Sequence, residues 1–121
     1  MSKNVLVVDD SAAIRQSVSY VLDQAGYVVI QAGDGEEALT KLDGTAFGLI
    51  ITDVNMTNMD GITLVKKVRE LGDYKFTPII VLTTESQGSK MEEGKAAGAT
   101  GWIVKPFDSD KLLSVVKKLA G

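Results

Sequence analysis

The stretch Val5-Leu-Val-Val-Asp-Asp10 is an uninterrupted run of aliphatic residues that ends at two acids. Four further short apolar runs follow it along the chain, at Val28–Ile30, Leu49–Ile51, Ile79–Leu82 and Trp102–Val104. Short runs rich in β-branched residues indicate strands, and runs without polar interruption indicate strands covered on both faces. The sequence therefore predicts five strands, of which the first, third and fourth are fully buried.

Helical patterns separate these runs. Between Ser11 and Gly26 the apolar residues recur at helical spacing, and Asp34 followed by Glu37 resembles a capping box. We expect helices to begin after Ser11 and after the capping residues Asp34, Asp60 and Ser109, and a weaker helical pattern covers residues 86–97. Strands that alternate with helices predict right-handed crossovers and a parallel sheet with helices on both sides. The expected fold is a doubly wound α/β domain that comprises residues 1–121 as a single unit.

Composition excludes several classes of function. The chain has 121 residues, of which 45% are hydrophobic and 24% charged, and this suits one soluble domain. A net charge of −3 provides no basic surface for nucleic acid, and no apolar run approaches the ~20 residues of a membrane span. There is no cysteine or histidine, so disulfides, zinc triads and histidine acid–base pairs are excluded. We expect a cytoplasmic protein.

Charged residues follow three of the predicted strands. Asp9 and Asp10 follow the first, Asp53 the third and Lys105 the fifth. Because the carboxyl ends of parallel strands share one edge of a sheet, these groups are expected to converge. Each pair of carboxylates repels by about 4 kcal/mol at about 4 Å in an effective dielectric of about 20. The pattern therefore predicts a site for a divalent cation.

The motifs at these positions also resemble a known family. They look like the four signatures of bacterial two-component response-regulator receiver domains, in order and spacing over the whole chain: Val7-Val-Asp-Asp-Ser11, Asp53-Val-Asn-Met56 with Met59-Asp-Gly61, Leu82-Thr-Thr-Glu85 and Val104-Lys-Pro-Phe107. The resemblance implies a flavodoxin-like sheet with five strands in the order 2-1-3-4-5 and five helices. Single-domain chemotaxis regulators are a known example of this order, so the expected order is not independent of the resemblance.

The same resemblance implies the chemistry. Asp53 would be the phosphoacceptor, whose carboxylate becomes an aspartyl phosphate. Lys105 would pair with the phosphoryl group as a point charge, and Thr83 would donate its hydroxyl to it. The implied cofactor is Mg²⁺, which binds through a few carboxylates and keeps several waters. Its implied protein ligands are Asp9, Asp10, Asp53 and the backbone carbonyl of Asn55.

Further positions would control signalling and rate. Trp102 occupies the place of the family's aromatic switch residue, usually Tyr or Phe, which turns inward when Thr83 moves toward the phosphoryl group. Asn55 and Glu85 resemble the pair that influences attack by water and access of a phosphatase. Thr84 stands where the family usually has a smaller residue, and its bulk would screen the phosphoryl group from water.

Each element has a purely structural alternative. Asp10 or Ser11 alone would serve as a helix N-cap, and Asp53 would serve to begin an Asx turn. Lys105 would then be a solvated loop lysine, and Trp102 a core aromatic on an edge strand. These alternatives give no reason why such residues all follow strand ends, so we favour the phosphoacceptor interpretation.

The expected function is a phosphorylation-activated response regulator that takes its phosphoryl group from a sensor histidine kinase. The expected output is a separate partner, with the flagellar motor switch of chemotaxis as the leading case and a single-domain phosphorelay regulator as the alternative. A phosphatase is a further expected partner, and the chain is expected to be a monomer that catalyses only its own phosphotransfer and dephosphorylation. An aspartate-nucleophile hydrolase fits less well, because Asp9-Asp10-Ser11 lacks the Asp-x-Asp-x-Thr spacing of that class. A pseudo-receiver that is never phosphorylated also fits less well, because every required side chain is present.

Overall fold

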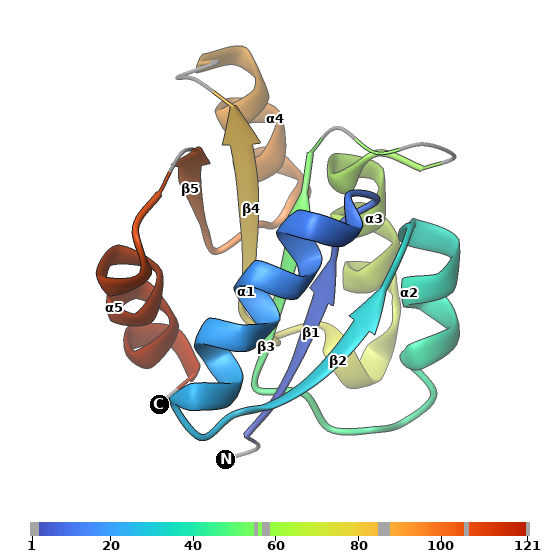
Figure 1. Ribbon diagram of the computed structural model, residues 1–121. Helices are drawn as coiled ribbons and strands as arrows, with labels where there is room; N and C mark the ends of the chain where they lie inside the picture. Colours follow the sequence, from blue (N-terminus) through green and yellow to red (C-terminus); the bar gives the residue numbers. More distant parts are fainter. Residues whose placement is uncertain (1–2, 55, 57–58, 85–87, 106, 121) are drawn as a thin grey trace.

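The fold is an open parallel sheet between two layers of helices (Figure 1). The computed structural model describes residues 3–54, 56, 59–84, 88–105 and 107–120. Within them the sheet has five parallel strands in the order β2-β1-β3-β4-β5, which confirms the predicted fold. The strands are β1 (Asn4–Val8), β2 (Val28–Ala32), β3 (Leu49–Asp53), β4 (Ile79–Thr84) and β5 (Gly101–Lys105).

The helices divide between the two faces of the sheet. They are α1 (Ala12–Gln24), α2 (Gly35–Lys41), α3 (Gly61–Glu70), α4 (Gly88–Ala97) and α5 (Ser109–Ala120), with a short 3₁₀ turn, η1 (Gly72–Tyr74), after α3. Figure 1 shows α1 and α5 on one face and α2, α3 and α4 on the other. Among the described residues, none of the helices is long and apolar enough to cross a bilayer.

The core consists of two apolar layers, one on each face of the sheet. The alternation of side chains along β1 shows the division: Val5 and Val7 pack with α1 and α5, whereas Leu6 and Val8 pack with α2 and α3. The apolar residues of the first, third and fourth predicted strands are all buried, as their uninterrupted runs predict. These three strands form the buried centre of the sheet, and the acidic groups lie at the ends of two of them, β1 and β3.

Most predicted helix starts are confirmed, and one is wrong. The side chains of Ser11, Asp34 and Asp60 each accept a hydrogen bond from a backbone N–H in the first turn of α1, α2 and α3. Ser109, in contrast, is the first residue of α5 and not its cap. Asp108 takes that role, because its carboxylate accepts the N–H of Lys111 at 2.7 Å and its negative charge suits a helix N-terminus.

The strands extend beyond the predicted apolar runs. β3 includes the polar Thr52 and ends at Asp53, which pairs with Leu82 of β4. Hydrophobicity alone does not mark these positions, because the ladder continues through residues whose side chains are polar. As a result, Asp53 sits on a regular strand, and its backbone is fixed by the sheet.

Arg69 connects the carboxyl end of α3 to two other segments. Its Nε and Nη2 atoms donate to the carbonyl of Gly98 at 3.0 and 2.8 Å. Nη1 donates to the carbonyls of Tyr74 and Thr77, at 3.0 and 2.6 Å. The side chain therefore links α3 with the turn after α4 and with the segment that leads into β4. Hydrogen bonds from a charged donor are stronger than neutral ones.

We expect Arg69→Ala to lower the free energy of unfolding by about 3 kcal/mol, because several partly buried carbonyls lose a charged donor. Arg69→Lys should recover little of this loss, since an ammonium cannot reproduce the planar fork. Urea denaturation measures the difference. Lys67→Ala, which removes an exposed cation two residues away, is the control and should change stability by less than about 0.5 kcal/mol. An Arg69→Ala variant as stable as this control would contradict the structural role.

Candidate functional site

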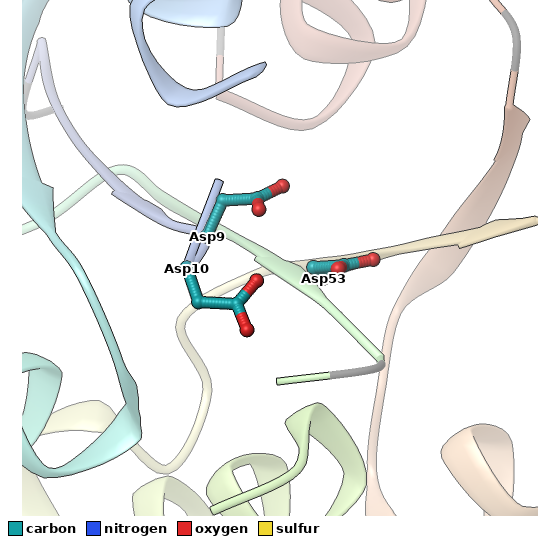
Figure 2. A group of neighbouring side chains, drawn as sticks. All are labelled: Asp9, Asp10 and Asp53. Atoms are coloured by element: carbon teal, nitrogen blue, oxygen red, sulfur yellow. The ribbon is translucent and has the colours of Figure 1, made fainter. Parts of the chain in front are cut away.

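Three carboxylates meet where β1 and β3 end (Figure 2). Asp9 follows β1, and Val8 pairs with Thr52, so Asp9 and Asp53 extend from neighbouring strands at the same level. Asp10 is the next residue and is exposed, whereas the other two are buried. One oxygen from each of Asp9, Asp10 and Asp53 lies within 4.8 Å of the others. The predicted convergence of these acids is confirmed.

Lys105 completes the cluster from the far side of β4. Its Nζ atom donates to Oδ1 of Asp53 at 3.0 Å and lies 3.8 Å from Oδ2 of Asp9. Only 14% of the Lys105 side chain is exposed, so water screens these interactions weakly. When all four groups are charged, one ammonium offsets only one of three carboxylates. A net negative charge therefore remains in a largely buried site.

The charged form of Asp9 is disfavoured by this arrangement. Oδ1 accepts the N–H of Ser11 at 2.8 Å, but Oδ2 is buried and has no hydrogen-bond partner among the described residues. Burial raises the pKa of the Asp9 carboxyl above its ordinary value, and the charges of Asp53 and Asp10 raise it further, while the Ser11 N–H and Lys105 oppose the shift. A buried carboxylate oxygen that lacks a hydrogen bond and lies beside two further carboxylates is compatible with a hard divalent cation such as Mg²⁺.

The predicted hydroxyl and aromatic positions lie on the two strands beyond β3. Thr83 is buried and follows Leu82, the partner of Asp53 in the ladder. Trp102 is on the edge strand β5 and is 39% exposed, so the alternative of a core aromatic is wrong. Thr84 ends β4, and the predicted roles of Asn55 and Glu85 fall on positions outside the described residues.

Gly61 is a site residue whose role the sequence pattern did not reveal. A Cβ atom at this position would overlap the backbone carbonyl of Asp53. The Gly61 N–H also donates to the carbonyl of Val54 at 2.9 Å, so α3 begins directly against the end of β3. Gly61 belongs to the motif Met59-Asp-Gly61 and follows the helix-capping Asp60, but neither feature by itself indicates this close approach.

Arg15 is the second residue that the sequence pattern does not single out. Its Nη1 atom donates to the backbone carbonyl of Asp9 at 2.6 Å, and its Nε donates to Oε1 of Gln31 at 3.1 Å. A helical arginine five residues after an acidic pair has no distinctive signature, because it is ordinarily a solvated surface residue. Its contact with the acidic turn depends on the packing of α1 against β1 and β2.

Comparisons with known proteins agree with this geometry. The family model described as response regulator receiver domain matches residues 5–117. Chemotaxis protein CheY1 of Helicobacter pylori is 40% identical over 119 residues, which cover 97% of this chain and 96% of that protein. The structure of chemotaxis protein CheY4 of Vibrio cholerae is 52% identical, with a TM-score of 0.93, and the match covers 98% of this chain and 99% of that one.

A longer relative shows the same domain in another context. The transcriptional regulatory protein FixJ of Bradyrhizobium diazoefficiens is 32% identical over 114 residues, which cover 94% of this chain but 55% of FixJ. Taken with the family match over residues 5–117 and the acidic cluster at the ends of β1 and β3, these likenesses show that the chain belongs to the response regulator receiver domain family.

Proposed function

We propose that Asp53 accepts a phosphoryl group from a sensor histidine kinase and that the phosphorylated domain signals in chemotaxis. One observation carries the assignment of Asp53: its carboxylate is the one that Lys105 contacts at 3.0 Å, inside the cluster formed with Asp9 and Asp10. The Asp53 carboxylate lies at the end of a strand and is held by a largely buried ammonium, so its orientation toward an incoming group is fixed. Such fixed geometry favours attack on an incoming phosphorus atom.

The proposed transfer needs alignment and neutralisation of charge. An oxygen of Asp53 forms the new bond to phosphorus, while the bond between phosphorus and the kinase imidazole nitrogen breaks and that nitrogen retains the electron pair. Negative charge on the phosphoryl oxygens is then offset by Lys105, which shifts from the carboxylate toward these oxygens. The Thr83 hydroxyl donates to another phosphoryl oxygen. The chain thereby catalyses only its own phosphotransfer and dephosphorylation.

Asp9, Asp10, Asp53 and the backbone carbonyl of Asn55 are the proposed protein ligands of Mg²⁺. The Oδ2 atom of Asp9, which is buried without a hydrogen-bond partner among the described residues, and the three clustered carboxylates support this choice. When bound, Mg²⁺ would neutralise charge on the phosphoryl oxygens and the carboxylates together. Asp9 and Asp10 thus hold charge in place for the transfer, and Asp53 reacts.

Chemotaxis is supported by the relatives that this chain matches over nearly its whole length. Both CheY1 and CheY4 are described as chemotaxis proteins, and each match covers at least 96% of the relative. FixJ, in contrast, has a large part that this chain does not match. From the two chemotaxis relatives we propose an output partner such as the flagellar motor switch, and a phosphatase that limits the lifetime of the signal. A single-domain phosphorelay regulator outside chemotaxis is the alternative function.

Incubation with phosphoramidate and Mg²⁺ should add one phosphoryl group to the wild type and none to Asp53→Ala, because the nucleophile is then absent. Intact-mass spectrometry under chilled, mildly acidic conditions measures the adduct. Asp23→Ala, which removes an exposed carboxylate of α1, is the control and should be phosphorylated like the wild type. A stable adduct in Asp53→Ala would place the nucleophile elsewhere.

Asp9→Asn should weaken Mg²⁺ binding by at least about tenfold and raise the melting temperature of the metal-free protein. The raised pKa of Asp9 means that the folded state binds more protons than the unfolded state in the pH range above 3.8, so metal-free stability falls as pH rises through that range. Asn at position 9 cannot ionise, so this loss of stability with rising pH should be absent from the Asp9→Asn variant. Thermal unfolding from pH 4 upward, with and without Mg²⁺, provides the measurement. A lower metal-free melting temperature at neutral pH in both Asp9→Asn and Asp10→Asn would show that these residues are mainly structural.

Beryllofluoride with Mg²⁺, which mimics the phosphoryl group, should change the fluorescence of Trp102. Movement of Thr83 toward the mimic would open space into which the half-exposed indole turns. Thr83→Ser retains the hydroxyl and should preserve much of the change, whereas Thr83→Ala should lose most of it. If the wild-type spectrum is unaltered although beryllofluoride is bound, Trp102 does not switch. The affected surface would comprise α4, β5 and α5, where Lys111 and Lys118 are exposed.

A further inference from the structure

We propose that Arg15 is a positioning residue for the cation site, and that it acts by fixing the backbone turn that carries Asp10. The guanidinium donates to the carbonyl of Asp9 through Nη1 at 2.6 Å and to Gln31 through Nε at 3.1 Å. Arg15 thus joins α1 and β2 to the single peptide unit between the two acids. This inference rests on the proposed function, because it concerns the same site.

Asp10 is the member of the cluster that needs such support. Asp9 and Asp53 are 1% and 7% exposed, so the surrounding core restricts their side chains. Asp10 is exposed, so core packing restricts its side chain less, and the direction that the backbone gives it matters more for bringing its carboxylate to the other two. The turn after β1 therefore contributes to the position of Asp10.

The geometry of the peptide bond transmits the effect of Arg15 to Asp10. The carbonyl of Asp9 and the N–H of Asp10 belong to one planar peptide unit. A hydrogen bond that fixes the carbonyl therefore also fixes the direction of the bond from the Asp10 nitrogen to its Cα atom. Two other bonds hold the flanking positions. The N–H of Asp9 donates to Ala32 at 3.2 Å, and the N–H of Ser11 donates to Oδ1 of Asp9 at 2.8 Å. Among the described contacts, the hydrogen bond from Arg15 holds the Asp9 carbonyl, which lies between these two N–H groups along the backbone.

Arg15 is itself held in place. Its backbone N–H donates to the carbonyl of the cap residue Ser11 at 3.0 Å, at the start of α1. The guanidinium also lies close to the turn after β2, because a Cβ atom at Gly33 would be 3.6 Å from Nη1. Nε and Nη1 reach their two acceptors from one planar group, which a lysine ammonium cannot do.

Positioning and simple charge make opposite predictions for metal affinity. A cation near the site repels Mg²⁺, so if Arg15 acted only through its charge, Arg15→Ala would bind Mg²⁺ more tightly. If Arg15 orients Asp10, its removal releases one ligand and weakens binding. Partners that orient metal ligands are typically worth 10- to 100-fold in affinity. We expect about a tenfold loss, toward the lower end of this range, because Arg15 acts through backbone and not through a ligand side chain.

Isothermal titration calorimetry of Mg²⁺ tests the inference on the full chain. Arg15→Ala and Arg15→Lys should each weaken binding about tenfold, because both lose the fork although the second keeps the charge. Lys66→Ala removes an exposed cation of α3 and is the control for net charge, with unchanged affinity expected. Gln31→Ala should weaken binding to a smaller extent, and it serves as the test variant if Arg15→Ala fails to fold by circular dichroism.

A double-mutant cycle with Asp10→Asn identifies the ligand through which Arg15 acts. In the Asp10→Asn background, Arg15→Ala should cause no further loss of Mg²⁺ affinity. Equal losses in both backgrounds, or tighter binding by Arg15→Ala, overturn the inference while the proposed metal site stands. Absence of Mg²⁺ binding to the wild type would overturn the metal site, and this inference with it.

Discussion

The ion pair between Lys105 and Asp53 is the interaction on which the rest of the site depends. It joins residues that are 52 positions apart and lie on strands separated by β4. Because the order of strands puts β1 beside β3, the acids that end these strands meet, and their mutual repulsion follows from the topology. Lys105 offsets part of that repulsion, and the raised pKa of Asp9 reflects its burial first and the remaining repulsion from Asp53 and Asp10 second. The cluster of three carboxylates and one ammonium thus retains a net negative charge that a bound cation would neutralise.

The architecture was largely predictable because its signals are local. The buried strands are short apolar runs, and the helices begin at capping residues such as Ser11 and Asp60. The errors have physical causes. Hydrophobicity did not mark the polar end of β3 at Asp53, where the backbone ladder continues. The choice of Ser109 as a cap failed because the preceding carboxylate of Asp108 satisfies the same N–H groups and suits the helix dipole better.

The reactive groups of the site could be predicted, but the residues that hold them could not. Charged side chains at strand ends are visible in the sequence, because the parallel topology brings such ends together. Arg15 and Arg69 were not predicted, since each acts by donating to backbone carbonyls of distant segments. No sequence spacing encodes a contact of that kind. Their roles emerge only when helix packing brings each guanidinium beside a particular turn.

The overlap that any side chain at Gly61 would have with the carbonyl of Asp53 means that the first turn of α3 abuts the reactive strand, backbone against backbone. The contact includes no flexible side chain that could absorb a displacement. Asp53 therefore cannot move toward α3 unless the backbone of α3 also moves. The first turn of α3 thus limits how far Asp53 can move in this direction. If Asp53 is phosphorylated as proposed, we expect the resulting movement to be taken up by β4 and the edge strand β5 and not by α3. The absence of a methyl group at Gly61 would thereby influence the direction of the signal.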